Sequence, residues 1–339
     1  MKNENRTKSS ISLPELKDVR IPELIYPWPN TNSPFSDQLG MEVQEWLEKD
    51  FDFLPPEMLL RYKKQHLHDV ATRMSPNAPS LKFMRPAVRY VTIAVLFDDY
   101  YESYSYEALD EVRNRLYDIF YRGLEPGTGD NGFFHQFAIL RREMLEVLPE
   151  RFLKWVADGH DRYIRYGMME EIQYKTTEVI PPLKAYELIR EYSVGMHACI
   201  YMVDLGTGFS LSQEANDHPA MIRLRVLLNR IIGWQNDFNS LPKEINKPNE
   251  VCNIVFVLER EFNISFDEAL KRAKKMHDDD LEEFIAICDN LKEFSIYSNE
   301  VEEYIYNMKL MISGCGQWYK EITTRYFPDA YTGMIAGNI

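Results

Sequence analysis

The feature that most constrains the fold is a helical pattern that begins near Ser36 and continues almost to the end of the 339-residue chain. Apolar residues recur three and four positions apart, a spacing that places them on one face of an α-helix. Proline and glycine gather between these segments, at residues 55–56, 76–79, 125–132, 181–182 and 206–208. Neither hairpin signals nor an internal repeat interrupts the pattern. The sequence therefore predicts an all-α protein, a single domain of about ten helices.

The first 35 residues differ from the rest, because prolines at positions 14, 22, 27, 29 and 34 forbid a continuous helix. We expect residues 1–35 to form an extended N-terminal arm that lies over a helical domain of residues 36–339.

Charge and composition exclude several classes of function. The formal net charge is −14, with 53 acidic against 39 basic residues, which argues against a nucleic-acid binder. The polar start of the chain lacks the apolar region of a signal peptide, and no apolar run is long enough to span a membrane. The four cysteines lie far apart, so we expect reduced thiols with neither a zinc site nor a disulfide. The prediction is a soluble, cytoplasmic protein.

One candidate site lies at the end of the segment Leu81–Tyr101. Residues 91–95 favour a strand by propensity, but the length of the segment predicts a helix with Pro86 in its first turn. Residues on one face step by three or four: Met84, Val88, Val91, Val95, Asp98 and Glu102. Carboxylates on a face that is normally buried need a compensating charge, and a hard divalent cation supplies one. The alternative is an exposed acidic helix end.

A second row of oxygen donors stands later in the chain. Asn236, Ser240 and Glu244 are four apart, so they share one side of a helix over two turns. An amide oxygen, a hydroxyl and a carboxylate form a donor set of low charge that suits Mg²⁺. The alternative is an ordinary polar helix face that ends at Pro242, where a kink would turn Glu244 away.

These motifs, Asp98-Asp99-x-x-Glu102 followed by Asn236-Asp237-x-x-Ser240-x-x-Lys243-Glu244, resemble the class I terpene synthase (terpene cyclase) family, bacterial type. Arg190 stands where the family places its diphosphate-sensing arginine, and Arg325-Tyr326 is similar to its diphosphate-binding pair. The arm, with Tyr26-Pro27-Trp28-Pro29, is similar to its N-terminal segment. The resemblance implies a class I terpenoid synthase α-helical bundle that encloses a central active-site cavity.

The resemblance also implies roles for individual residues. Three Mg²⁺ ions are expected, with Asp98, Glu102, Asn236, Ser240 and Glu244 as metal ligands. Glu102 stands where the family usually has Asp, and Asp99 is expected to bind a basic partner. The substrate diphosphate would be bound by Arg190, Lys243, Arg325 and Tyr326.

The implied reaction is ionisation of a linear prenyl diphosphate, farnesyl or geranylgeranyl diphosphate, and cyclisation to a sesquiterpene or diterpene with release of diphosphate. Asp98 and Arg190 are expected to take part in catalysis. A helix break at Ser193-Val194-Gly195 would present the Val194 carbonyl to the substrate. Aromatic rings would stabilise the carbocation, and Phe97 and Trp318 are favoured because they neighbour the motifs. Further candidates to line the cavity are Phe83, Tyr101, Trp234 and Tyr319. A homodimer is compatible with the family.

Two alternative functions stay open. A chain-elongating prenyltransferase needs two aspartate-rich motifs, and Asp279-Asp280-Leu281-Glu282-Glu283 is a second sequence of the same form. It stands in a highly charged stretch with no apolar stripe before it, so it is predicted to be a solvated helix start. The other alternative is a catalytically silent isoprenoid-binding helical protein.

Overall fold

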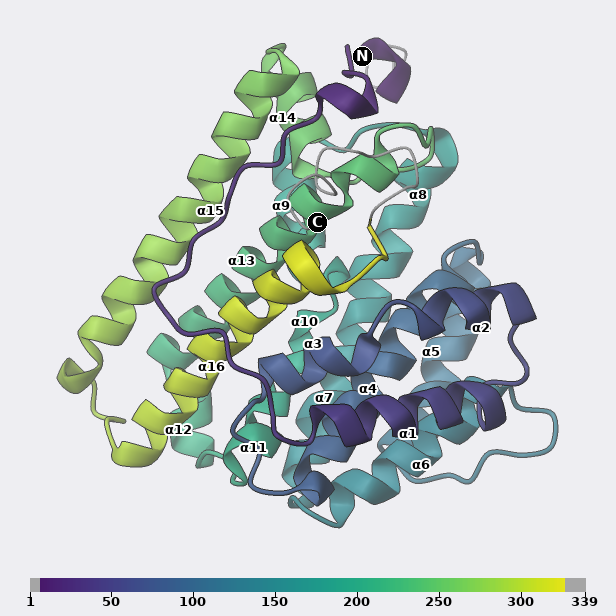
Figure 1. Ribbon diagram of the computed structural model, residues 1–339, viewed down its shortest axis with the longest axis vertical. Coiled ribbons are helices and arrows are strands. Elements are labelled where there is room, and N and C mark those ends of the chain that lie inside the picture. Colours follow the sequence, from purple (N-terminus) through teal and green to yellow (C-terminus); the bar gives the residue numbers. More distant parts are fainter. Residues whose placement is uncertain (1–6, 327–339) are drawn as a thin grey trace.

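Sixteen α-helices joined by short loops make up the computed structural model, which describes residues 7–326 (Figure 1). The all-α prediction is confirmed: the described residues contain no strand beyond one isolated bridge between Thr7 and Val179. The helices are α1 (Ser36–Lys49), α2 (Pro56–Lys63), α3 (Leu67–Met74), α4 (Leu81–Tyr101), α5 (Tyr106–Phe120), α6 (Gly132–Leu145), α7 (Glu150–Arg162), α8 (Met169–Thr177), α9 (Leu183–Ser193), α10 (Met196–Cys199), α11 (Met202–Thr207), α12 (Gln213–Asp217), α13 (Pro219–Glu244), α14 (Ile254–Phe262), α15 (Phe266–Asp289) and α16 (Asn299–Gln317).

Five shorter helical turns complete the secondary structure. Three are 3₁₀ turns and two are π-helical, and both π turns continue an α-helix: η2 (Lys8–Ser10), η3 (Leu16–Asp18), η5 (Leu291–Glu293), η4 (Tyr163–Met168) and η6 (Trp318–Ile322). The number of α-helices exceeds the predicted one mainly because α10, α11 and α12 are short pieces around backbone breaks.

The helix predicted for residues 81–101 is α4, with the same bounds. Pro86 is its sixth residue, so the expectation of a first-turn proline was wrong. The helix tolerates this position because the carbonyl left without a donor belongs to Lys82, an exposed residue that water can reach.

In the described segment before α1, residues 7–35, the helical elements are the turns η2 and η3. Figure 1 shows it, in purple, running beside α14 and α15 toward α1. Tyr26 Oη hydrogen-bonds His277 Nε2 of α15 at 2.8 Å, and Ser313 Oγ of α16 donates to the Pro29 carbonyl at 2.9 Å. Residues 1–6 of the predicted arm and 327–339 of the predicted domain lie outside the described residues.

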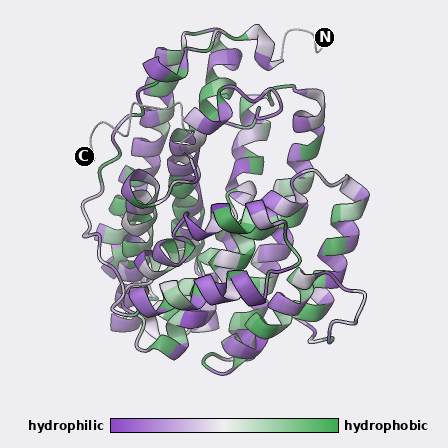
Figure 2. Ribbon diagram, turned by 45° about the vertical axis from the view of Figure 1, so that its right-hand side comes forward, coloured by the Kyte–Doolittle hydropathy of each residue, from purple (hydrophilic) through white to green (hydrophobic). Residues whose placement is uncertain are grey.

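The helices bury their apolar faces against one another in two clusters. The larger cluster joins α1, α3–α7, α10, α11 and α16 to the first half of α13. The smaller one joins α14 and α15 to the second half of α13 and to Val19 of the arm. Hydrophobic and hydrophilic residues alternate along most helices in Figure 2, the pattern of amphipathic helices. The helix α13 belongs to both clusters, so its side chains occupy the middle of the protein.

The second acidic sequence, Asp279–Glu283, is not a helix start. It lies in the interior of α15, which begins at Phe266 after the N-cap Ser265. Asp280 is buried, where the sequence predicted a solvated face. Within residues 7–326, no helix is both long and apolar enough to cross a bilayer.

Candidate active site

The apolar stripe of α4 leads from the core into a cavity of about 200 Å³ between the helices. Met84 and Val88 are fully buried, and Val91, Val95 and Asp98 line the cavity. Glu102, directly after α4, lines it as well. The predicted inward face therefore holds for Asp98, whereas Glu102 lies at the cavity in an exposed position.

Asp99 also reaches the cavity, but it is paired with protein cations. Arg325 donates from Nη2 to Oδ1 at 2.7 Å and from Nη1 to Oδ2 at 2.8 Å, a two-pronged ion pair. Tyr62 Oη donates to Oδ2 at 2.7 Å, and Arg61 reaches the same oxygen at 3.2 Å. Burial alone favours the neutral acid, but the charge and hydrogen bonds of Arg325 lower the pKa of Asp99 below its ordinary value. The expected basic partner of Asp99 is therefore Arg325.

Asp98 and Glu102 have no such partner. About half of the Asp98 side chain, 51%, is accessible from the cavity, and Arg325 Nη2 is 3.9 Å from its Oδ2. One hydroxyl, Tyr163 Oη, donates to Asp98 Oδ1 at 2.5 Å. Glu102 forms no hydrogen bond or ion pair with any described residue. Enclosure by protein raises the pKa of both carboxyls, and the charge of Asp99 raises that of Asp98 further.

Tyr163 reaches Asp98 because it begins the π-helical turn η4 between α7 and α8. Such a turn inserts a residue into the helix and shifts which side chains face inward. The turn packs closely on the end of α9: a Cβ atom on Gly167 would lie 2.6 Å from Ser193 Cα. The sequence analysis missed Tyr163, because the spacing through residues 150–177 is that of an ordinary helix.

Another part of the cavity wall comes from α13, where Asn236, Ser240 and Glu244 lie in a row. The helix continues past Pro242 to Glu244, so the kink does not turn this carboxylate away. Glu244 Oε2 accepts a hydrogen bond from Asn253 Nδ2 at 2.8 Å. Burial, together with the charge of Glu250, raises the pKa of Glu244 to about 7.

Arg190, on α9, is bonded to the beginning of this row. Its Nη2 donates to Asn236 Oδ1 at 2.6 Å and lies 2.8 Å from Asp237 Oδ1. Asn236 Nδ2 donates in turn to the hydroxyls of Tyr319 and Tyr326, each at 3.1 Å. Arg190 Nε is buried and has no hydrogen-bond partner among the described residues. The guanidinium at the cavity wall therefore keeps one donor for an anion.

The predicted helix break is confirmed. The helix α9 ends at Ser193, Gly195 adopts a left-handed φ of 75°, and α10 starts at Met196. Glycine suits this conformation because it has no Cβ atom. Val194 lines the cavity at the break.

Two lysines add positive charge to the cavity wall. Lys243 forms no hydrogen bond or ion pair with a described residue, although its charge helps to lower the pKa of Asp99. Lys175, on α8, pairs with Glu171 at 2.9 Å. The sequence analysis missed Lys175, Glu171 and Glu250, because a Glu and a Lys four residues apart are typical of an exposed helix face.

Some of the aromatic side chains that were predicted to line the cavity do so, and others do not. Trp318 and Tyr319 line the cavity, where Trp318 Nε1 donates to the His66 carbonyl at 3.1 Å. The prediction that Phe97 lines the cavity was wrong. This fully buried ring packs in the core against Phe133, Phe137, Tyr101 and His160. Its position follows from α4, since a residue adjacent to Asp98 points to another side of the helix. The candidates Phe83, Tyr101 and Trp234 are also absent from the wall, whereas Tyr90 belongs to it.

The donors at the cavity fit a hard divalent cation. Glu102 and Glu244 form no ion pair with a described residue, Asp98 has only the 3.9 Å contact with Arg325, and Asn236 and Ser240 add neutral oxygens. Among the described residues, no group of three His, Cys, Asp or Glu side chains is arranged to hold a metal ion by itself. Mg²⁺ needs few protein ligands and shares its other sites with water and phosphate oxygens, so α4 and α13 together suit a metal–phosphate complex.

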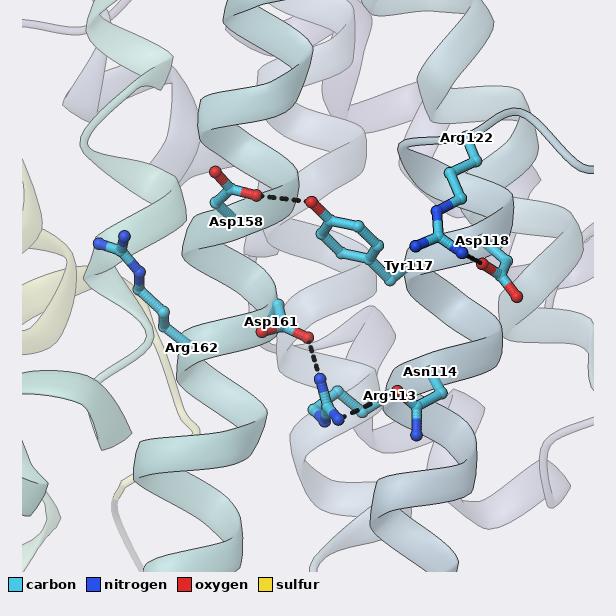
Figure 3. Close-up of a pocket in the computed structure, with 8 residues that line it drawn as sticks. All are labelled: Arg113, Asn114, Tyr117, Asp118, Arg122, Asp158, Asp161 and Arg162. Carbon is cyan, nitrogen blue, oxygen red and sulfur yellow. Dashed lines mark hydrogen bonds and ion pairs between the residues drawn. The ribbon is translucent and has the colours of Figure 1, made fainter.

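A more open pocket of about 630 Å³ lies between α5 and α7, but its charged residues other than Arg162 are paired with one another or with neighbouring side chains (Figure 3). Three pairs account for most of its polar groups: Arg113 with Asp161 at 2.6 Å, Arg122 with Asp118 at 2.6 Å, and Tyr117 with Asp158 at 2.8 Å. None of the sequence motifs contributes to it. The central cavity is therefore the candidate site.

Comparisons with known proteins find a matching family and relatives over most of the chain. The model of terpene synthase family 2, C-terminal metal binding, matches residues 89–283, which is more than half of the chain. Germacrene A synthase of Nostoc punctiforme is 25% identical over 313 residues, covering 90% of this chain and 95% of that protein. The 4-epi-cubebol synthase ((2E,6E)-farnesyl diphosphate cyclizing) of Streptosporangium roseum is 24% identical over 319 residues, covering 93% and 94%.

Solved structures share the fold. The 2-methylisoborneol synthase of Streptomyces coelicolor, in complex with Mg²⁺ and 2-fluoroneryl diphosphate, superimposes with a TM-score of 0.79. The alignment covers 91% of this chain and 98% of that one at 17% identity.

Proposed function

This chain belongs to terpene synthase family 2, a metal-binding family of lyases, and from this premise we propose that it ionises farnesyl diphosphate and cyclises the resulting cation to a sesquiterpene. The observation that carries the proposal is a set of cavity carboxylates, Asp98, Glu102 and Glu244, that no protein cation approaches closer than 3.9 Å, next to the unpaired donors of Arg190 and Lys243. Acids of this kind need a cation, and the adjacent basic groups need an anion.

We assign the metal to the two rows of oxygen donors. Asp98 and Glu102 from α4 would hold Mg²⁺ on one side, and Asn236, Ser240 and Glu244 from α13 on the other, with three ions in all. Bound Mg²⁺ supplies Lewis-acid stabilisation of the charge that develops on the leaving diphosphate. For Asn236 to become a ligand, its Oδ1 must be shared with or released from Arg190, which now donates to it at 2.6 Å.

The basic residues would bind the leaving diphosphate. Arg190 has a spare Nε donor, and Lys243 has no protein partner among the described residues. Arg190 is held by Asn236 and Asp237 before the reaction, so its charge would stabilise the departing anion without a large reorganisation. Lys175 is a further candidate for this set. Arg325 and Tyr326 contribute more indirectly, since Arg325 is bonded to Asp99 and Tyr326 to Asn236.

The rest of the cavity would protect the carbocation from water. Val91, Val95 and Val194 provide apolar wall, and the rings of Trp318 and Tyr90 lie at its surface. An allylic cation survives where water is excluded and aromatic faces offset its charge. The Val194 carbonyl, at the break after α9, would orient or polarise the substrate.

The C15 substrate is favoured over the C20 one by the curated relative whose name states farnesyl diphosphate cyclisation. The sequence-based predictions of a homodimer and of a cytoplasmic location stay predictions, as does the division into an arm of residues 1–35 and a catalytic domain of residues 36–339.

The test is incubation of the purified protein with geranyl, farnesyl and geranylgeranyl diphosphate, each with Mg²⁺ and with EDTA, followed by gas chromatography–mass spectrometry. We expect a cyclic product from farnesyl diphosphate alone, lost with EDTA and in Asn236→Ala. Asn246→Ala, at an exposed position just after α13, is the matched control and should keep the activity.

Other outcomes point elsewhere. A longer linear diphosphate formed only when isopentenyl diphosphate is added would indicate a prenyltransferase. Folded protein that releases no diphosphate from any of the three substrates would contradict the proposal and favour isoprenoid binding.

A further inference from the structure

Lys8, in the first described turn of the arm, carries a buried ammonium group with a complete set of partners. Lys8 as a whole is only 6% exposed. Its Nζ donates to the backbone carbonyls of Glu244 at 2.6 Å, Lys247 at 2.7 Å and Glu250 at 2.9 Å. An ammonium has three donors, so all are used.

The three carbonyls belong to the end of α13 and the loop that follows it. The last carbonyls of a helix have no partner within the helix, and a cation there also complements the helix dipole. The ring of Phe256 lies 4.3 Å from Lys8 Nζ and covers the ammonium from another side. Lys8 therefore fixes the backbone of residues 244–250, which carries Glu244 and Glu250 to the cavity wall.

Lys8 and its neighbour Thr7 also contact the end of α8, a second helix that lines the cavity. Thr7 forms an antiparallel bridge with Val179, and Lys8 N donates to the Glu178 carbonyl at 3.3 Å. These partners directly follow α8, the helix that carries Lys175. Residues 7–8 thus join the end of α8 to the end of α13, although the arm is far from the motifs in sequence.

We propose that Lys8 is a positioning residue for the metal site: it holds the 244–250 loop so that Glu244 faces the cavity in a fixed orientation. This inference rests on the proposed function, in which Glu244 is a metal ligand. Partners that orient a metal ligand from behind typically change metal affinity by about 10–100-fold when removed.

The experiment compares Lys8→Met with wild-type protein and with Lys17→Met, a matched control at an exposed arm lysine. We measure diphosphate release against Mg²⁺ concentration at saturating farnesyl diphosphate. Lys8→Met is expected to raise the Mg²⁺ concentration for half-maximal rate about tenfold while the rate at saturating Mg²⁺ falls less. Lys8→Arg keeps a cation and should recover much of the loss, and Lys17→Met should match wild type.

Two measurements do not depend on turnover. Mg²⁺ with inorganic diphosphate should raise the melting temperature of wild-type protein, and Lys8→Met should need about tenfold more Mg²⁺ for the same rise. Amide hydrogen exchange over residues 245–251 should be faster in Lys8→Met than in Lys17→Met. If Lys8→Met does not fold, Lys8→Gln, which keeps two donors, is used for all three measurements and should show the same changes to a smaller degree.

The outcomes separate this inference from the proposed function. A lowered melting temperature with unchanged Mg²⁺ dependence would mean that Lys8 only stabilises the fold, and would overturn the inference. Unchanged exchange over 245–251 would overturn it too. If wild-type protein itself neither turns over the prenyl diphosphates nor is stabilised by Mg²⁺ with diphosphate, the proposed function fails and the inference falls with it.

Discussion

The five-residue form Asp-Asp-x-x-Glu occurs at Asp98–Glu102 and again within the acidic run of α15, at Asp279–Glu283, in two different environments. Asp98–Glu102 ends α4 at the central cavity, where Asp98 accepts from the Tyr163 hydroxyl and lies 3.9 Å from Arg325, and Glu102 has no described partner. Asp279–Glu283 lies inside α15, where each of the three residues that define the motif pairs with a cation. Lys275 pairs with Asp279 at 2.6 Å, Arg230 with Asp280 at 2.9 Å, and Arg223 with Glu283 at 2.6 Å.

The difference shows what makes an acidic motif available to a metal. A carboxylate already bound to an arginine or lysine has its charge compensated, whereas one that faces a cavity without a counterion keeps its affinity for a cation. The pKa directions agree: enclosure raises the pKa of Asp98 and Glu102, while Arg223 lowers that of Glu283. The residue types are the same, and the surrounding helices decide the function.

The largest expected effect is on activity, which a substitution in the first motif should lower far more than one in the second. Asp98→Asn removes a charge that Arg325, at 3.9 Å, compensates only in part, and we expect diphosphate release to fall about 1000-fold, in the range for loss of a key electrostatic group. Asp279→Asn, at an exposed ion pair, should stay within about twofold of wild type. Steady-state release assays at saturating Mg²⁺ measure both. Equal losses in the two variants would remove the distinction.

The next effect concerns stability. Arg325→Met leaves the buried Asp99 carboxylate without its cation and should lower the free energy of unfolding by about 3 kcal/mol. Arg223→Met breaks the half-exposed pair with Glu283 and should cost less than about 1 kcal/mol. Urea denaturation gives both values. The double variant Asp99→Asn/Arg325→Met should regain part of the loss, and its failure to do so would mean that Arg325 acts through packing instead of charge.

Asp280→Asn tests whether the second motif serves only the fold. Asp280 Oδ2 accepts from Trp234 Nε1 at 2.7 Å and from Arg230 Nε at 2.9 Å in a buried position. Removing its charge should destabilise the protein by about 2 kcal/mol. The Mg²⁺ dependence of the folded variant should be unchanged. A marked rise in the Mg²⁺ requirement would assign Asp280 to the site.

The smallest expected effect is a pH dependence of the free energy of unfolding, which has opposite signs for Asp98 and Glu283. The pKa of Asp98 is raised in the folded protein, so the folded state holds its proton more strongly than the unfolded chain does. The contribution of Asp98 to stability is therefore greatest at low pH and is lost as the pH rises through the folded pKa. In EDTA, Asp98→Asn should be more stable than wild type at pH 7.5, by less than about 1 kcal/mol, and equal to it near pH 3.

Glu283 gives the matching comparison, because its lowered pKa means that its contribution is present at neutral pH and is lost as the pH falls through the folded pKa. Glu283→Gln should be less stable than wild type at pH 7.5, with the difference vanishing in acid. Thermal unfolding in EDTA at several pH values measures both variants. An Asp98→Asn protein that is less stable at pH 7.5 would contradict the stated sign.

The two rows of oxygen donors at the cavity could be predicted from the sequence, because the helical period determines which residues share one face of a helix. Asp98 and Glu102 follow an apolar stripe, and Asn236, Ser240 and Glu244 follow a spacing of four, so both rows could be predicted without knowing the fold. The prediction for Phe97 was wrong for the same geometric reason, because a residue next to Asp98 in sequence lies on a different side of α4. Tyr163, Lys175 and Lys8 were not predictable, since a π turn and two long-range contacts bring them to the site.

Both ends of the described part of the chain contact elements that line the cavity, and this constrains the order of assembly during synthesis. Lys8 fixes the loop behind Glu244, and the last described residues, Arg325 and Tyr326, complete the cavity through Asp99 and Asn236. A nascent chain emerges from its N-terminus, so Asp99 has no counterion until Arg325, 226 positions later, has left the ribosome. No translation product that stops before residue 325 contains this ion pair. A message truncated at such a position would yield a helical protein in which the Asp99 carboxylate lacks its cation.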